Sequence, residues 1–187
     1  LPYRDARLMS EPKDESVTLV DYDPSWPRTF AQEARRLENA DLPGFLAVEH
    51  IGSTAVPGMS AKPIIDIMLT VTIPARSRQL IRRLEALGYR YLGNFGLRGR
   101  HFFRLGKPAQ VHLHVVNNRS PHTRAWLDFR DTLRTRPEWF AYYEREKSNL
   151  ARLYRYDRAA YTAAKGPIVA TVLNGTYTGK EPGPSLD

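Results

Sequence analysis

The 187-residue sequence predicts an α+β fold in which a mixed sheet, with helices packed on one face, is followed by a C-terminal helical cluster. Short apolar segments that suit strands are concentrated between residues 46 and 116. From residue 121 onward, apolar residues recur three or four positions apart, as in helices. No internal repeat is present, so we expect one domain over residues 17–174, with flexible tails at 1–16 and 175–187.

The N-terminal part begins with a short strand expected at residues 17–20 and continues into a helix. Ser25 is a residue type that commonly caps a helix, and Pro27 is tolerated in a first helical turn. Apolar side chains then recur at helical spacing at Phe30, Ala34 and Leu37. These signals predict a helix that starts near Ser25.

Strands are expected at residues 46–51 and 64–71, on either side of a loop of small residues. Pro74 then opens a helix that Gly88 ends. The apolar stripe of this helix consists of Leu80, Ile81, Leu84 and Leu87. A further short strand is expected at residues 89–92.

A β-hairpin is predicted from residues 101–105 and 111–116, because the five residues that connect these apolar segments include a glycine. Three helices follow. Trp126, Phe129 and Leu133 share a stripe in the first, Pro137 starts the second, and Asp157 caps the third. Gly166 and Pro167 should kink or interrupt the third helix.

Composition limits the class of protein. Apolar residues make up 42% and charged residues 26% of the chain, as in soluble globular proteins, and no apolar stretch is long enough to span a membrane. The complete lack of cysteine excludes disulfides and thiolate chemistry and fits a cytoplasmic location. A net charge of +8 favours an anionic partner such as a nucleotide or phosphate ester, unless the excess is simply solvated. Nucleic acid is a weaker expectation, because the basic residues are scattered.

The loop after the first predicted strand of the sheet has the composition of a phosphate site. Gly52 and Ser53 follow the strand directly, and Thr54 and Lys62 add a hydroxyl and a cation. Glycine lets backbone N–H groups approach a ligand closely, so such a turn can hold phosphate. The sequence has no P-loop pattern, and the alternative interpretation is an ordinary structural turn.

Asp66 is the single carboxylate in the apolar segment 64–69. Side chains alternate along a strand, so Asp66 shares a face with Ile64 and Met68, while Ile65, Ile67 and Leu69 form the core face. A carboxylate near a phosphate-binding turn suits Mg²⁺, which binds one or two carboxylates together with substrate phosphates. The alternative is a structural ion pair with Lys62 or an arginine.

His112 and His114 are two residues apart on a predicted strand, so their imidazoles share one face. They are candidates for acid–base catalysis or for metal binding with Asp66, and Glu49 is a further candidate metal ligand. His50 and His101 lie at or near strand ends and would join them in a histidine-based metal site. Candidate phosphate-binding residues from the helical part are Arg130, Lys147, Tyr161 and Lys165.

Several segments together resemble the GrpB family (UPF0157) of the nucleotidyltransferase superfamily. They are Tyr22–Pro27, His50–Gly58, Ala61–Ile67, His112–Val116, Phe129–Arg134, Lys147 and Tyr161–Lys165. The resemblance implies a polymerase-β-like nucleotidyltransferase fold. In that superfamily the Gly-Ser turn holds a nucleoside triphosphate, and two or three carboxylates bind two Mg²⁺ ions. A domain of the family also occurs fused to dephospho-coenzyme A kinases.

The chain departs from the superfamily pattern at its acidic motif. The usual motif has two carboxylates one residue apart, whereas Ile64 and Met68 flank Asp66 on its face. A third carboxylate would lie on the later strand, where His112 and His114 stand instead. Either the metal site is rebuilt from Asp66, the histidines and Glu49, or two-metal catalysis is lost.

Three hypotheses follow. The leading one is an enzyme that uses Mg²⁺, or another divalent cation held by the histidines, to transfer a nucleotidyl or related phosphoryl group from ATP or another nucleoside triphosphate to a small acceptor. The second is a degenerate accessory protein that binds a nucleotide or phosphate without turnover. The third is a metal-dependent hydrolase or ligase built on the four strand histidines.

Overall fold

The computed structural model describes residues 16–72 and 77–178. Five strands form one mixed sheet in the order β1-β2-β5-β4-β3. They are β1 (Phe45–Ile51), β2 (Ile65–Val71), β3 (Arg90–Tyr91), β4 (Arg100–Leu105) and β5 (Val111–Asn117). The neighbours β2 and β5 run parallel, whereas the other pairs are antiparallel. The predicted hairpin is therefore confirmed as β4–β5.

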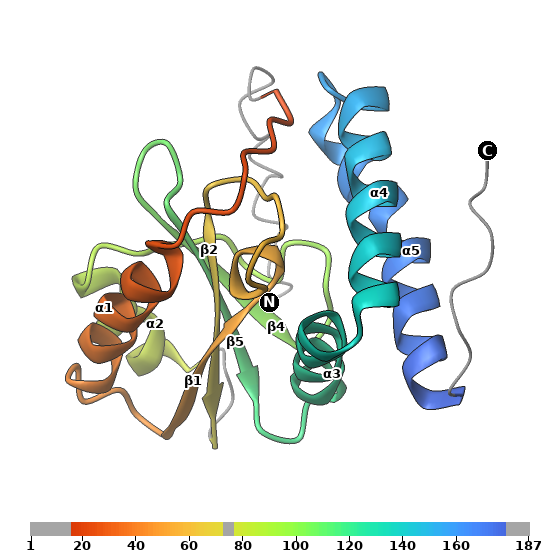
Figure 1. Ribbon diagram of the computed structural model, residues 1–187. Coiled ribbons are helices and arrows are strands. Elements are labelled where there is room, and N and C mark those ends of the chain that lie inside the picture. Colours follow the sequence, from red (N-terminus) through yellow and green to blue (C-terminus); the bar gives the residue numbers. More distant parts are fainter. Residues whose placement is uncertain (1–15, 73–76, 179–187) are drawn as a thin grey trace, which may run out of the picture.

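Helices cover both faces of this sheet. They are α1 (Trp26–Glu38), α2 (Arg78–Ala86), α3 (Pro121–Thr135), α4 (Pro137–Leu153) and α5 (Arg158–Thr178). Figure 1 shows α1 and α2 on one side of the sheet, and α3 with the adjacent pair α4 and α5 on the other. The predicted α+β organisation is confirmed: α1 and α2 pack on one face, and the C-terminal helical cluster lies on the other.

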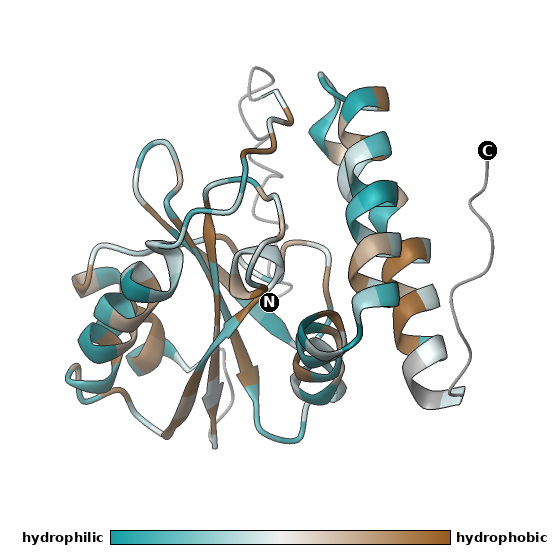
Figure 2. Ribbon diagram, in the orientation of Figure 1, coloured by the Kyte–Doolittle hydropathy of each residue, from teal (hydrophilic) through white to brown (hydrophobic). Residues whose placement is uncertain are grey.

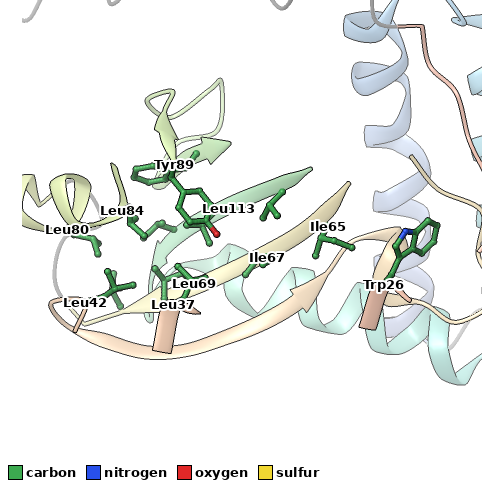
Figure 3. Packing of buried hydrophobic residues seen from close by; sticks show 14 of the residues in the cluster. Trp26, Leu37, Leu42, Ile65, Ile67, Leu69, Leu80, Leu84, Tyr89 and Leu113 are labelled. Atoms are coloured by element: carbon green, nitrogen blue, oxygen red, sulfur yellow. The ribbon is translucent and has the colours of Figure 1, made fainter. Parts of the chain in front are cut away.

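The main core lies between the sheet and the first two helices. Leu37 of α1 and Leu84 of α2 pack there against Ile67 and Leu113, which come from β2 and β5 (Figure 3). The side chains that point to this face are the alternate apolar residues of each strand, as the strand period requires. A second cluster joins the three C-terminal helices around Trp139, and the apolar C-terminal half of α5 contributes to it (Figure 2).

Several local expectations need correction. Residues 17–20 form no strand, because only Val20 makes an isolated bridge, to Ala61. Ser25 does precede α1, but its side chain caps no backbone N–H. Pro167 does not interrupt α5, which is one continuous helix, and Gly175 is buried within it rather than part of a flexible tail. Position 74 and the tails 1–15 and 179–187 lie outside the described residues.

Candidate functional site

Asp66 and the two strand histidines meet on the face of the sheet that is opposite the main core. The parallel register of β2 and β5 places Asp66 beside His112 and Met68 beside His114. Nδ1 of His112 and Nε2 of His114 both lie 3.2 Å from Oδ1 of Asp66. One carboxylate oxygen therefore accepts hydrogen bonds from both imidazoles.

The protonation of this cluster follows from its contacts. Burial alone would raise the pKa of Asp66, but the two histidine hydrogen bonds outweigh burial and hold that pKa well below its usual value. Burial lowers the pKa of His114, against the opposing attraction of Asp66. Asp66 is therefore ionised at neutral pH, and His114 is neutral with its proton on Nε2.

Arg100 completes a chain of hydrogen bonds that ends on Asp66. Its Nη1 lies 3.3 Å from Nδ1 of His114, which accepts because its Nε2–H already donates to the carboxylate. Nη2 of the same guanidinium donates to the backbone oxygens of Asn94 and Phe95, at 3.1 and 2.8 Å. Arg100 thus ties the loop of residues 93–99 to the Asp66 cluster.

The Gly-Ser turn lies directly against Asp66. Gly52 has φ +71° and ψ −172°, a backbone conformation that is essentially restricted to glycine. A Cβ at this position would be 2.8 Å from Oδ2 of Asp66. Glycine is therefore required both by the backbone conformation and by the approach of the carboxylate.

The two hydroxyls of the turn have different environments. Burial raises the pKa of Tyr143 on α4 to about 12, and the nearby Ser53 hydroxyl opposes this rise. Thr54 is buried, and its Oγ1 accepts from Nε2 of His50 at 3.0 Å while it donates to the backbone oxygen of Ile64. Ser53 thus lies at the junction of sheet and helices, whereas the hydroxyl of Thr54 is fully engaged in hydrogen bonds to other residues of the protein.

The helical cluster brings cations to the same region. Lys165 of α5 is close enough for the Asp66 carboxylate to act on its ammonium group electrostatically, although burial lowers the pKa of this lysine overall. Its Nζ lies 4.8 Å from the centre of the buried Tyr161 ring, and Nζ of Lys62 lies 5.9 Å from the same ring. The two lysines therefore lie near one buried ring, and Lys165 also lies within electrostatic range of Asp66.

Lys147 has a structural contact instead. This fully buried lysine donates to Oε2 of Glu144 at 2.8 Å and to the backbone oxygen of Ser60. Burial lowers its pKa to about 8, against the attraction of Glu144. Lys147 therefore holds the end of the 52–60 loop on α4, which differs from the direct phosphate contact expected for it.

Glu49 and Arg130 form a separate group. Nη1 of Arg130 donates to Oε2 of Glu49 at 2.8 Å and to the backbone oxygen of His50 at 3.0 Å. Asp131 binds the same guanidinium at 2.7 Å. Glu49 is therefore engaged by an arginine rather than grouped with Asp66, and both charges of the pair are compensated.

His50 and His101 lie on the face of the sheet that carries the main core. His50 is paired with Ile67 in the ladder and stacks on Phe30 of α1, with ring centres 4.7 Å apart. His101 is paired with Val115 and hydrogen-bonds to Tyr91. Because these two rings lie on the face opposite Asp66, the prediction of a metal site built from all four strand histidines is wrong.

The donor set also limits which metal the site can hold. Among residues 16–72 and 77–178, no three His, Cys, Asp or Glu side chains are grouped so that they could hold a metal ion. Of the predicted metal ligands, Asp66, His112 and His114 do meet, but as a hydrogen-bonded cluster, and Glu49 is held outside it by Arg130. Asp66 alone fits the single carboxylate contact of a Mg²⁺ ion that arrives with substrate phosphates. A two-metal centre does not fit.

Sequence reasoning missed three contributors to this face: Arg100, Phe102 and Arg104. In the ladder, Phe102 is paired with His114 and Arg104 with His112, so all of these side chains share a face. Arg104 is buried and lies 5.5 Å from the centre of the Phe102 ring. The alternation of Phe102 and Arg104 along the strand predicted at 101–105, with Arg100 directly before it, was a signal that could have identified them.

Two cavities, of about 350 and 320 Å³, lie elsewhere. The larger is lined by Pro57, Leu133, Arg134, Pro137 and Phe140. Among the residues that line the smaller are Tyr22, Phe30, Glu49, His50 and Arg130. Neither cavity is lined by Asp66 or its two histidines.

Comparison with known proteins assigns the family. The model of the GrpB protein family matches residues 16–174, so the chain belongs to the GrpB family. UPF0157 protein PA4798 of Pseudomonas aeruginosa is 40% identical over 180 residues, which span 92% of this chain and 72% of that protein. The expected family membership is confirmed.

Solved structures agree with this assignment. The crystal structure of the conserved protein GrpB from Enterococcus faecalis matches with a TM-score of 0.78 and 31% identity, over 87% of this chain and 98% of that one. Cid1, described as an RNA terminal uridylyl transferase, is only weakly similar, with a TM-score of 0.35 and 14% identity over 63% of this chain and 40% of that one. In the described part of the chain, no helix is both long and apolar enough to cross a lipid bilayer.

Proposed function

We propose that the protein binds a nucleoside triphosphate at the Asp66 face and transfers a nucleotidyl or related phosphoryl group to a small acceptor. The observation that carries this proposal is the contact between the Gly52 turn and an ionised Asp66, on the side of the sheet that faces Lys165. A glycine turn, a carboxylate and a lysine in one place are the groups that phosphate and its counterion require.

The charges of the cluster support an anionic ligand. Asp66 contributes one negative charge, whereas the guanidinium groups of Arg100 and Arg104 on the same face contribute two positive charges. Bringing a triphosphate to these groups would compensate the excess positive charge. Ser53, at the junction of the turn and α4, is the hydroxyl that could donate to a phosphate oxygen.

Mg²⁺ is the cofactor that suits this arrangement. Oδ1 of Asp66 is occupied by two imidazole N–H groups, which leaves Oδ2 as the oxygen for the metal. When bound, the ion would neutralise charge on the phosphates.

His112 is the candidate general base. Its Nδ1–H donates to Asp66, so Nε2 carries the free lone pair, and this buried atom has no hydrogen-bond partner in the described structure. An acceptor hydroxyl that attacks the α-phosphorus would form the new P–O bond as the bond to pyrophosphate breaks, and its proton would pass to Nε2 of His112. Asp66 would stabilise the resulting imidazolium, as a carboxylate does in related acid–base pairs.

One observation favours binding without turnover as a second candidate function. Asp66 is the only carboxylate in the described cluster, and its Oδ1 is saturated by histidine N–H groups rather than left open for two metals. An accessory protein that senses a nucleotide would retain the glycine turn and the cations but would release no pyrophosphate.

Calorimetric titration with each nucleoside triphosphate, with and without Mg²⁺, tests the binding step. We expect saturable binding that needs Mg²⁺ and that falls at least tenfold in Asp66→Asn, because the metal contact is lost. His101→Gln is the matched control, since His101 sits on β4 but faces the core side of the sheet. Its affinity should equal that of the wild type.

Pyrophosphate release in the presence of a panel of small hydroxyl, amine and phosphate acceptors then separates the two candidate functions. Release that disappears in His112→Gln supports transfer. Binding without release, across the panel, supports the accessory function. If the wild-type protein binds no nucleoside triphosphate, the proposed function is wrong.

A further inference from the structure

Phe95 adopts a backbone conformation that its residue type disfavours. It has φ +44°, in the left-handed region, whereas most residues found there are Gly, Asn or Asp. Three glycines of the same loop, Gly93, Gly96 and Gly99, also have positive φ, so the 93–99 loop is built from unusual turns. A bulky aromatic side chain in such a position is a strained choice that calls for a reason.

Packing alone does not supply that reason, because 41% of Phe95 remains exposed. The Phe95 ring nevertheless packs against two other side chains, those of Phe102 and Arg104. It stacks on Phe102, with ring centres 5.1 Å apart and planes 30° apart, and the Arg104 guanidinium lies 5.3 Å from its centre. Nη2 of Arg100 binds the Phe95 backbone oxygen at 2.8 Å. The result is an exposed aromatic ring backed by a second ring and by two arginines.

This support is continuous with the Asp66 cluster. The buried Phe102 ring lies 5.1 Å from the ring centres of both His112 and His114. Phe102 stands on β4, two strands away from Asp66 on β2 and level with Met68, two residues further along, which corresponds to a separation of about 12 Å. A nucleotide spans a distance of this order between its phosphates and its base.

We propose that Phe95 is a stacking platform for the nucleobase of the ligand whose phosphates bind at the Gly52 turn. The inference rests on the proposed function and extends it by assigning the base-binding residue. Bases of every kind present a π face, so a single exposed ring supported by Phe102 and two arginines would bind purines and pyrimidines alike. Phe95 should therefore supply affinity for the base without strict choice among bases.

The test compares ATP with inorganic tripolyphosphate, which has the phosphates but no base. Binding of each is measured by calorimetry in Mg²⁺ for the wild type and for Phe95→Gly. We expect Phe95→Gly to weaken ATP binding by about 5- to 150-fold and to leave tripolyphosphate binding unchanged. Because glycine accepts positive φ, relief of backbone strain should offset part of the lost packing on Phe102, so this variant should fold, which its unfolding temperature checks.

Two further variants make the result specific. Phe95→Tyr keeps a ring and should bind ATP as the wild type does. Tyr156→Ala removes another aromatic side chain, which is 80% exposed at the turn between α4 and α5, and should change neither affinity. Tight ATP binding by Phe95→Gly would overturn the base platform and leave the proposed function intact. Failure of the wild type to bind either compound would overturn both.

Discussion

Two adjacent rows of residues across the same three strands show how differently this sheet uses its faces. Ile67, Leu113 and Phe103 are paired across β2, β5 and β4, and all three are 0% exposed in the core beneath α1 and α2. The next row along the same strands consists of Asp66, His112 and Arg104, which are also paired with one another. Each is a sequence neighbour of one residue in the apolar row. One row is wholly apolar, and the other contains a carboxylate, an imidazole and a guanidinium.

The difference separates stability from ligand binding. Apolar side chains on the core face stabilise the fold by burial, and their environment needs no ligand. The polar row is expensive to bury, since each group needs partners, and Nε2 of His112 lacks one in the described structure. A buried polar row that is only partly satisfied is a feature of a binding face. Substitutions on the two faces should therefore have different effects.

The largest effects should come from neighbouring residues of β5 that point to opposite faces. Leu113→Ala creates a cavity in the core and should reduce the free energy of unfolding by about 2–5 kcal/mol, with nucleotide affinity unchanged. His112→Gln can still donate to Asp66, so it should cost less than about 1 kcal/mol of stability, but it removes the base at Nε2 and should lower the transfer rate at least about tenfold. Urea unfolding and pyrophosphate release measure the two quantities. Equal loss of transfer in both variants would remove the distinction between the faces.

The second comparison lies within the 52–60 loop. Gly52→Ala places a Cβ against Oδ2 of Asp66 at a backbone conformation reserved for glycine. It should lower the free energy of unfolding by about 2–4 kcal/mol, and it should also abolish nucleotide binding. Gly58→Ala is the matched control, because its φ is +80° but its nearest neighbour, Phe140, would be 3.9 Å away. Gly58→Ala should lower the free energy of unfolding by about 1–2 kcal/mol and should still bind the nucleotide. Similar affinities for both variants would show that the Asp66 contact is not needed.

The smallest predicted effect is a pH dependence of the free energy of unfolding, caused by His50 on the core face. Burial lowers the pKa of His50 to about 4, so the unfolded chain takes up a proton near pH 6.5 that the folded protein resists. Stability should therefore be lost as pH falls from 6.5 towards 4, and this residue should account for about 2 kcal/mol at pH 5. Urea unfolding at pH 7.5 and 5 should show a smaller loss for His50→Gln than for the wild type. An unchanged loss would exclude His50 as its source.

Much of the fold could be predicted because local patterns determine it. The alternation around Asp66 and the helical spacing after residue 121 gave the correct element types, and the glycine in the short connection gave the hairpin. The parallel pairing of β2 with β5 joins segments that are far apart in the chain, and no local pattern specifies it. That pairing is what places Asp66 between the histidines.

The site was predicted in part for the same reason. Strand alternation shows which residues share a face, and this grouped His112 with His114. It does not show which charge each side chain meets, so Glu49 was assigned to a metal although Arg130 binds it. Lys147 is held by Glu144, three residues earlier on α4, a spacing that the sequence did contain.

The central claim, that the Asp66 face binds a nucleoside triphosphate, can be tested by mapping the ligand on the protein with amide ¹H–¹⁵N NMR spectra during a titration with Mg²⁺–ATP. Saturable shifts should concentrate at the amides of Gly52, Ser53, Asp66, Phe95 and His114, and the amides of α1 and α2 should not shift. Shifts centred on the cavity lined by Tyr22 and His50, or no shifts at all, would contradict it.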